Sequence, residues 1–212
     1  MIHLNDEKRV KKSWEKYWQN YHCVTKIGAW SQKQSLNRAF LIIKELALEK
    51  NAKIIDVGCG EGRTLQAFRK NGYKNSIGID NTKESLELCQ KKGFKILKDV
   101  FLVDAQKTGF KNDEFELVFS EGLLEHFKDP SKIINQMARI SGKYVLLVQP
   151  NHYSLYGKAL AVLGHLLRHN IREYPLTRDY FIKKFKDRGF YLKTGNFTLL
   201  GEFFILLFEK KP

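Results

Sequence analysis

The sequence predicts an α/β fold whose doubly wound, mostly parallel sheet of seven strands ends in an antiparallel hairpin. Short apolar segments rich in β-branched residues alternate with helix-forming segments over residues 53–149. Such alternation is typical of βαβ units, in which helices cover both faces of a parallel sheet. The tail after residue 189 carries two more apolar segments with no helix between them.

The predicted elements follow one another along the chain in regular order. The expected parallel strands are 53–57, 76–80, 101–105, 115–120 and 143–149. The expected helices between them are 64–70, 82–92 and 132–140. A glycine ends each of these helices, because only glycine adopts the left-handed cap conformation freely: Gly72, Gly93 and Gly142.

The C-terminal tail departs from this alternation. A helix over 178–188 ends at Gly189, and strands over 190–200 and 201–211 follow, joined by a short Gly-Glu turn. Strands joined so closely must be antiparallel, because a parallel pair needs a crossover connection.

The N-terminal residues 1–50 indicate two helices, around 8–21 and 33–49. Both precede the first strand. We expect this segment to form a helical lid or cap over a ligand cleft.

Length and composition predict one folded domain over residues 1–212. Hydrophobic residues make up 43% and charged residues 28%. The first residues lack the apolar core of a signal peptide, and the apolar segment 159–167 is too short to span a bilayer. The cysteines follow no disulfide or metal-ligand spacing, so we expect no metal site and a reduced, cytoplasmic protein: Cys23, Cys59 and Cys89.

The formal net charge of +14 favours anionic partners such as RNA, a membrane surface or acidic metabolites. The lysines are spread along the chain without a block of like charges. A lysine-rich solvated surface therefore explains the charge as well as an RNA-binding face does.

A glycine-rich loop follows the first predicted strand in the stretch IIDVGCGEGRTL, residues 54–65. Its position is the place where doubly wound sheets bind ligands, outside the carboxyl ends of the strands. The spacing excludes a dinucleotide fingerprint, because Arg63 stands where the third glycine would be, and a Walker A ending is absent. Asp56 just before the loop disfavours a polyphosphate and favours a ligand with a positive group.

Two further acidic residues stand at the expected ends of the next strands. Asp80 ends the second strand, where a carboxylate can accept both hydroxyls of a ribose. Asp104 and Ala105 end the third, where they can read the amino edge of an adenine. A single such Asp is usually a turn former, but three in register with a glycine loop indicate a nucleoside site.

These motifs resemble one known family. IIDVGCGEG, then GID, then VDAQKTGFKNDEFELVFSEGLLEHF, is similar to the class I S-adenosylmethionine-dependent methyltransferases, in the small-molecule branch of ubiquinone and menaquinone methyltransferase-like (type 11) proteins. The resemblance covers about residues 50–150, and the tail hairpin fits the family's last two strands. It implies a Rossmann-like fold and S-adenosyl-L-methionine as cofactor, bound without a metal.

The resemblance also assigns roles position by position. It places the methionine part of the cofactor on the loop, the ribose on Asp80 and the adenine beside Asn81, Asp104 and Ala105. Ser120 and Glu121, which leave the fourth strand, face the transferring methyl group. The loop positions it matches are Asp56, Gly58 and Gly60, with Cys59 as a small residue that fits tightly beneath the cofactor.

The catalytic candidates follow the fourth predicted strand. His126 has an ordinary pKa suited to proton removal at neutral pH, and its alternative role is to cap or pack the next loop. Glu121 is the second candidate, as a base, as an anchor for a cationic acceptor or as a ligand of the cofactor's ammonium. Glu125 is expected to be a solvent-facing acid.

Two segments without family motifs are predicted to form the acceptor pocket. In residues 14–30, Trp14, Tyr17, Trp18 and Tyr21 share one helical face, which either packs on the core or closes over the ligands. The segment 151–177 is a substrate-side insertion with a helix from Ser154 to about Arg168. Its apolar face can line a pocket, pack on the first segment or touch a membrane surface.

The sequence thus predicts a methyltransferase that acts on an oxygen or nitrogen of a small molecule. An RNA acceptor is the alternative that the charge supports, although SEGLLEH after the fourth strand lacks the N-P-P-Y pattern of adenine-N6 enzymes. A non-catalytic cofactor-binding subunit on the same fold is a third reading.

Overall fold

The computed structural model describes residues 2–19, 26–156, 158, 162 and 172–211. Its centre is a seven-stranded sheet in the order β3-β2-β1-β4-β5-β7-β6, which confirms the predicted fold class. The strands are β1 (Ile54–Val57), β2 (Ser76–Asp80), β3 (Val100–Leu102), β4 (Phe115–Glu121), β5 (Ser141–Pro150), β6 (Phe190–Phe197) and β7 (Phe203–Lys210). β1 to β5 are parallel, and β7 is antiparallel to both β5 and β6.

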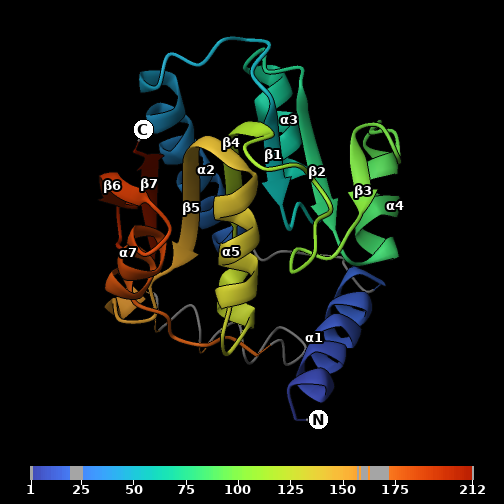
Figure 1. The fold of residues 1–212 in the computed structure, drawn as a ribbon. Coiled ribbons are helices and arrows are strands. Elements are labelled where there is room, and N and C mark those ends of the chain that lie inside the picture. The colour runs from blue at the N-terminus through green and yellow to red at the C-terminus, as the bar shows by residue number, and fades with distance from the viewer. Residues whose placement is uncertain (1, 20–25, 157, 159–161, 163–171, 212) are drawn as a thin grey trace.

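Helices lie on both faces of this sheet, as Figure 1 shows. The described helices are α1 (Ile2–Gln19), α2 (Lys26–Glu45), α3 (Arg63–Lys70), α4 (Lys83–Lys91), η1 (Leu124–His126), α5 (Ser131–Ile140) and α7 (Arg178–Lys186). One core joins α5 and α7 to the sheet around Met137, Phe181 and Phe185. A second core packs Phe40 and Ile43 of α2 on the opposite face.

The strand order creates the switch point that the glycine loop was expected to occupy. From β1 the chain adds β2 and then β3 on one side, and it returns to place β4 on the other side of β1. The chain connections on the two sides of the β1–β4 pair therefore run in opposite directions along the sheet. Open α/β sheets bind ligands at such a point, outside the carboxyl ends of the strands. In Figure 1 these ends point down, toward α1.

The third strand is shorter than predicted. β3 ends at Leu102, which pairs with Asp80, the last residue of β2. As an edge strand, β3 has only β2 to pair with, so the ladder stops when β2 stops. Asp104 consequently lies beyond the strand, in a turn, and its predicted position at the strand end is wrong.

The C-terminal hairpin is confirmed, but its turn differs from the expected Gly-Glu pair. β6 ends at Phe197 and β7 begins at Phe203, so residues 198–202 form the connection. Thr198 Oγ1 donates to Glu202 Oε2 at 2.6 Å, and the Gly201 N–H donates to the Thr198 carbonyl at 2.9 Å. These bonds close a longer loop around two side chains that are both buried.

The N-terminal helices are present with shifted ends, since α1 begins at Ile2 and α2 begins at Lys26. Most of the predicted helix from Ser154 to Arg168 lies outside the described residues, as do Tyr21 and Cys23. Of the helices that the structure describes, none combines the length and apolar character needed to cross a membrane.

Candidate functional site

The glycine loop is tied to the carboxyl end of β2. The N–H groups of Gly58 and Cys59 both donate to the Ile79 carbonyl at 2.9 Å. The Gly60 N–H donates to Asp80 Oδ2 at 3.1 Å, while Asp80 Oδ1 accepts from both the N–H and the hydroxyl of Thr82. Asp80 thus fixes the loop and the start of α4 at the same time.

Gly60 carries the tightest contact of the loop. Its φ of +51° lies in the left-handed region, which favours glycine. A side-chain carbon at this position would lie 2.9 Å from the Cη2 and Cζ2 atoms of Trp18. The indole of α1 therefore rests directly on the loop, and a ligand that approaches Gly60 from this side must displace it.

Asp56 is the next-to-last residue of β1, beneath the loop, and is buried. Its Oδ2 atom has no hydrogen-bond partner among the residues that the structure describes. Burial raises the pKa of this carboxyl well above its ordinary value, the nearby Glu121 raises it further, and Arg63 opposes the shift. A positive group at the loop would satisfy the orphaned oxygen, as expected for a cationic ligand.

Glu121 is held at the end of β4 by residues from two helices. Arg63 NH2 lies 2.8 Å from Glu121 Oε2, and the Ser35 hydroxyl donates to Oε1 at 2.7 Å. Arg63 NH1 also donates to Gln32 Oε1 at 2.7 Å, so the guanidinium joins α2, α3 and β4. Because the Glu121 carboxylate is held in this ion pair, it is better suited to bind a positive group than to accept a proton.

Glu125 and His126 lie in η1, directly after β4, and both are buried. The expectation that Glu125 faces solvent is therefore wrong: η1 folds inward, and the N–H of Tyr174 donates to the Glu125 carbonyl at 2.6 Å, which covers this turn. Within the described part of the chain, Glu125 Oε2 has no hydrogen-bond partner. Burial and then the charge of Glu173 raise the pKa of the Glu125 carboxyl well above its ordinary value.

The ring of His126 is fixed on two sides. Its Nδ1 atom lies 3.1 Å from the Arg172 carbonyl, and Trp14 packs edge-to-face against it with ring centroids 4.8 Å apart. Burial lowers the pKa of the imidazole, against smaller opposing effects of Glu173 and of the Arg172 and Gly122 carbonyls. In the tautomer with its proton on Nδ1, the ring donates to the Arg172 carbonyl and keeps a lone pair on Nε2, which lies 3.7 Å from Oε1 of Glu125.

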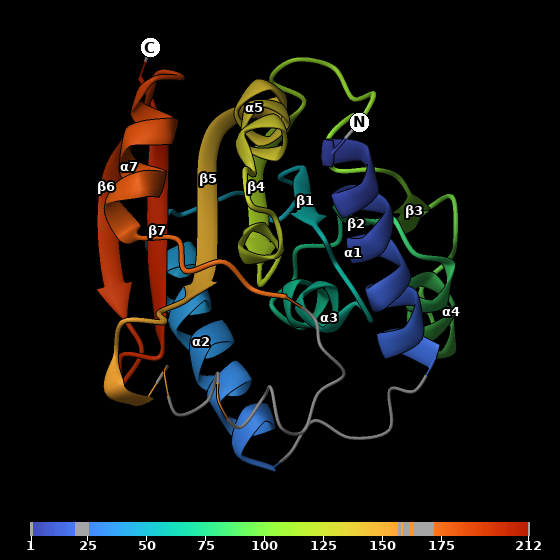
Figure 2. The ribbon, with the colours of Figure 1, turned by 90° about the horizontal axis from the view of Figure 1, so that it is seen from below.

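An aromatic cluster on α1 covers this end of the sheet. Trp14 stacks on Trp18 at 5.6 Å, and Tyr17 meets both rings edge-on. The Gln19 side chain donates to Glu84 of α4 at 2.9 Å and fastens the end of the helix. Figure 2 shows α1 crossing the carboxyl ends of β1 and β2.

Comparison with known proteins identifies the central part of the chain. Residues 55–146 match the family model described as a methyltransferase domain. Over these residues the chain is similar to a methyltransferase domain. The uncharacterized methyltransferase YcgJ of Bacillus subtilis is 28% identical over 121 residues, 54% of this chain and 46% of that protein. A tRNA U34 carboxymethyltransferase of Shewanella sediminis is 30% identical over 146 residues, 65% of this chain and 43% of that protein.

The fold of this chain recurs in solved structures. The crystal structure of magnesium protoporphyrin IX methyltransferase from Synechocystis PCC 6803 with bound SAH matches with a TM-score of 0.73 at 18% identity, over 97% of this chain and all of that one. At this identity the likeness concerns the fold. The chain spans less than half the length of YcgJ and of the carboxymethyltransferase.

The remaining residues predicted to bind the cofactor range from buried to exposed. The Ser120 hydroxyl donates to the Val57 carbonyl at 2.8 Å and is buried, so it ties β4 to β1. Asn81 is half-buried beside Asp80, and Ala105 packs against the α5 core. Asp104 is exposed, and its Oδ1 accepts the Gln106 N–H at 2.8 Å, the bond of a turn former.

Cys59 lies buried under the loop, next to Cys89 of α4. The Cys89 thiol donates to the Gly60 carbonyl at 3.1 Å, and the hydrogen bond between the two thiols raises the pKa of Cys59, with burial adding to the effect. Cys59 thus packs as a small protonated residue. Within the described ranges, no group of three or more His, Cys, Asp or Glu side chains could hold a metal ion.

The sequence did not reveal several residues that complete the site. Arg63 served only to exclude a dinucleotide, although a cation at the first position of a helix is unfavourable without a carboxylate partner and so signals one. Ser35, Gln32 and Arg172 carry no local signal, because their contacts arise between segments far apart in the chain.

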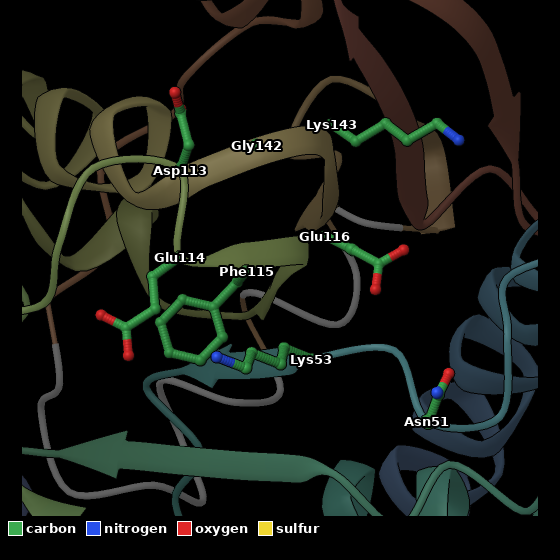
Figure 3. A pocket seen from close by; sticks show the side chains of 8 residues that line it. All are labelled: Asn51, Lys53, Asp113, Glu114, Phe115, Glu116, Gly142 and Lys143. Atoms are coloured by element: carbon green, nitrogen blue, oxygen red, sulfur yellow. The ribbon is translucent and has the colours of Figure 1, made fainter.

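A cavity of about 440 Å³ lies at the other end of the sheet. Figure 3 shows its lining at the amino ends of β1, β4 and β5: Asn51, Lys53, Asp113, Glu114, Phe115, Glu116, Gly142 and Lys143. Three carboxylates and two lysines line it, and histidine and cysteine are absent from the lining. It is remote from the glycine loop, since the strands separate the two ends.

Proposed function

We propose that the chain transfers a methyl group from S-adenosyl-L-methionine to an oxygen or nitrogen atom of a small-molecule acceptor. The observation that carries the proposal is the pairing of two buried groups at one end of the sheet. Asp56 presents an orphaned oxygen under the glycine loop, and His126 presents a neutral ring after β4. The first suits a cationic donor and the second suits removal of a proton from an acceptor.

The residues at β1 and β2 fit this cofactor. Asp56 would face its positive groups, Gly58 and Gly60 allow close approach of the backbone, and Asp80 would take the ribose hydroxyls. Asp80 already accepts three hydrogen bonds from the chain, and a carboxylate offers about four lone-pair sites, so one site is left for a ribose hydroxyl, and a second becomes available if the Thr82 hydroxyl turns away. When bound, S-adenosyl-L-methionine supplies a methyl group on a positively charged sulfur.

His126 would act as the proton acceptor. Its lowered pKa keeps the ring neutral at physiological pH, and the lone pair on Nε2 can take a proton. The carbonyls of Arg172 and Gly122 then stabilise the doubly protonated ring, because both oxygens accept N–H donors. Trp14 keeps water from one side of the ring.

Glu121 would hold a positive group, either the ammonium of the cofactor or that of an amine acceptor. Its carboxylate is fixed by Arg63 and Ser35, so it presents a defined direction without moving. Alignment of donor and acceptor by such fixed groups supplies much of the rate of a displacement reaction.

The test is a transfer assay with methyl-labelled S-adenosyl-L-methionine and a panel of small amines, phenols and carboxylates. Label is expected in an amine or phenol product and absent when His126→Asn replaces the native chain. Tight cofactor binding without transfer to any panel member would favour the non-catalytic subunit. The predicted cytoplasmic location would be tested by fractionation of cells that express the chain.

An RNA acceptor remains a second candidate because of two observations. The net charge is +14, and one relative at 30% identity is a tRNA U34 carboxymethyltransferase. Labelled transfer to bulk tRNA, with a binding constant that falls steeply with salt, would replace the small-molecule proposal.

A further inference from the structure

Large apolar side chains are exposed on two loops at the carboxyl end of the sheet. Leu155 is 88% exposed and Tyr153 is 58% exposed after β5, while Leu199 and Leu200 are 73% and 44% exposed between β6 and β7. We call these four residues the apolar rim. A cluster of this kind, in contrast to single exposed leucines, marks an interaction surface.

The two loops are held side by side. The Asn151 N–H donates to the Glu202 carbonyl at 2.7 Å, and the Asn151 side-chain amide donates to the Gly201 carbonyl at 2.8 Å. A side-chain carbon at Gly201 would lie 3.7 Å from Cβ of Ser154. Figures 1 and 2 place both loops at the same corner of the molecule, so the rim is one surface.

The rim is connected to the candidate base by a short segment. The Tyr153 hydroxyl donates to the Pro175 carbonyl at 3.2 Å, and Tyr174 bonds through its N–H to Glu125. Arg172, in the same segment, presents its carbonyl to His126. Residues 172–175 therefore lie between the rim and η1. A molecule bound at the rim would lie on the side of the site where we expect the acceptor.

The charge around the rim is mostly positive. From residue 151 to residue 172 the sequence contains no Asp or Glu, and it includes Lys158 and Arg172, which are both exposed. Of the neighbouring acids, Glu202 is buried, and Glu173 lies 3.5 Å from Nε2 of His152. The chain as a whole carries a net charge of +14. Exposed leucines beside cations match an anionic lipid surface, which offers an apolar phase beneath negative headgroups. RNA offers the negative charge without the apolar phase.

We propose that this corner docks on an anionic lipid surface, with the apolar rim in the interface and Lys158 and Arg172 on the headgroups. The protein then lies on the membrane without spanning it. Residues 172–175 join this corner to the candidate base, so the acceptor is an amphiphile taken from the lipid phase, a consequence that rests on the proposed methyl transfer.

The test is flotation of the full chain with vesicles of phosphatidylcholine containing 30–40% phosphatidylglycerol, roughly the anionic content that attracts basic proteins. Leu155→Asp and Leu199→Asp are each expected to lower the partition coefficient at least about tenfold, as loss of one buried leucine implies. Leu97→Asp is the matched control, because Leu97 is 78% exposed before β3 at the far edge of the sheet, and its partition should stay within about twofold of the native value.

Charge-reversal variants give a second test in the same flotation experiment. Lys158→Glu is expected to lower partition at least about fivefold, since each basic residue at an anionic surface contributes on the order of 1 kcal/mol. Lys98→Glu, at an exposed lysine near β3, makes the same charge change far from the rim and is expected to have a smaller effect. Vesicles of phosphatidylcholine alone should bind the native chain weakly.

Three results would overturn the proposal: no binding to the anionic vesicles, equal losses in the rim and control variants, or equal binding to neutral vesicles. Sedimentation of the chain alone tests a competing occupant. A dimer that Leu155→Asp converts to monomer would make a second copy the partner of the rim. Because vesicle binding is measured without donor or acceptor, its outcome is independent of whether methyl transfer is found.

Discussion

The two halves of the carboxyl end of the sheet are built by contacts of different range. At β1 and β2 the loop is fixed by Gly60 and Asp80, which are 20 positions apart in the chain. At β4 the contacts reach 86 positions from Glu121 to Ser35 and 46 from His126 to Arg172. A nucleoside site can therefore be set by one βαβ unit, whereas the acceptor side depends on segments that lie far apart in the chain.

We expect the largest effect on activity from a substitution at the β4 side, where the contacts are long-range. His126→Ala should lower turnover by about 10²–10⁴-fold, the usual contribution of a positioned base, while calorimetry shows unchanged affinity for S-adenosylhomocysteine. His126→Asn is the matched variant, because its amide can still donate to the Arg172 carbonyl without acting as a base. Full activity in the Asn variant would reduce His126 to a structural role.

The same residue predicts a pH dependence for the native chain. Burial lowers the pKa of His126 below 6.5, and the base works only when unprotonated. The rate constant kcat/KM should therefore be flat from neutral pH down to 6.5 and fall only at lower pH, in a profile measured on one acceptor. A limb centred above pH 7 would assign the proton transfer to another group.

Asp80→Ala tests the short-range half. The variant loses the bonds to Gly60 and Thr82, and with them the expected ribose contact, so calorimetry should show binding of S-adenosylhomocysteine weakened by about 100-fold or more. Asp104→Ala removes an exposed turn carboxylate and should change the affinity by less than about threefold. Comparable losses in both variants would restore Asp104 as a ligand residue.

Trp18 links α1 to the short-range half, because its ring rests on Gly60. If the ring must leave before a ligand reaches the loop, the apparent affinity is reduced by the fraction of molecules in the closed state. Trp18→Ala should then raise the affinity for S-adenosylhomocysteine about 3–10-fold in titrations, and Trp30→Ala should not. A weaker-binding Trp18 variant would instead make the indole part of the binding surface.

The smallest effect concerns stability. The raised pKa of Glu125 means that ionisation opposes folding: its contribution is favourable below the ordinary value of 4.5 and is lost as the pH rises through the folded-state pKa. Glu125→Gln removes this cost, so thermal unfolding at pH 7.5 should shift upward by about 2–4 °C, and less at pH 5. A lower melting temperature at both pH values would show that the carboxylate has a cationic partner in solution.

Particular residues show where sequence reasoning reached its limit in the site. Asp56, Gly60 and Asp80 could be predicted as candidates because the loop spacing and the strand ends are local signals. Asp104 was misplaced because an edge strand ends where its only neighbour ends, which its own residues do not encode. Glu125 was misjudged because its burial comes from Tyr174, 49 positions away, whose backbone closes over η1.

The sequence by itself determined the βαβ alternation, the antiparallel tail and the loop that turns at glycine, because each depends on periodicity and backbone preferences within a few residues. Only the tertiary structure decided that α1 lies with Trp18 on the loop and that Arg63 joins α2 to β4. It also decided that the two loops of the apolar rim lie side by side. These contacts depend on packing between distant segments, whose free energy no local pattern of residues records.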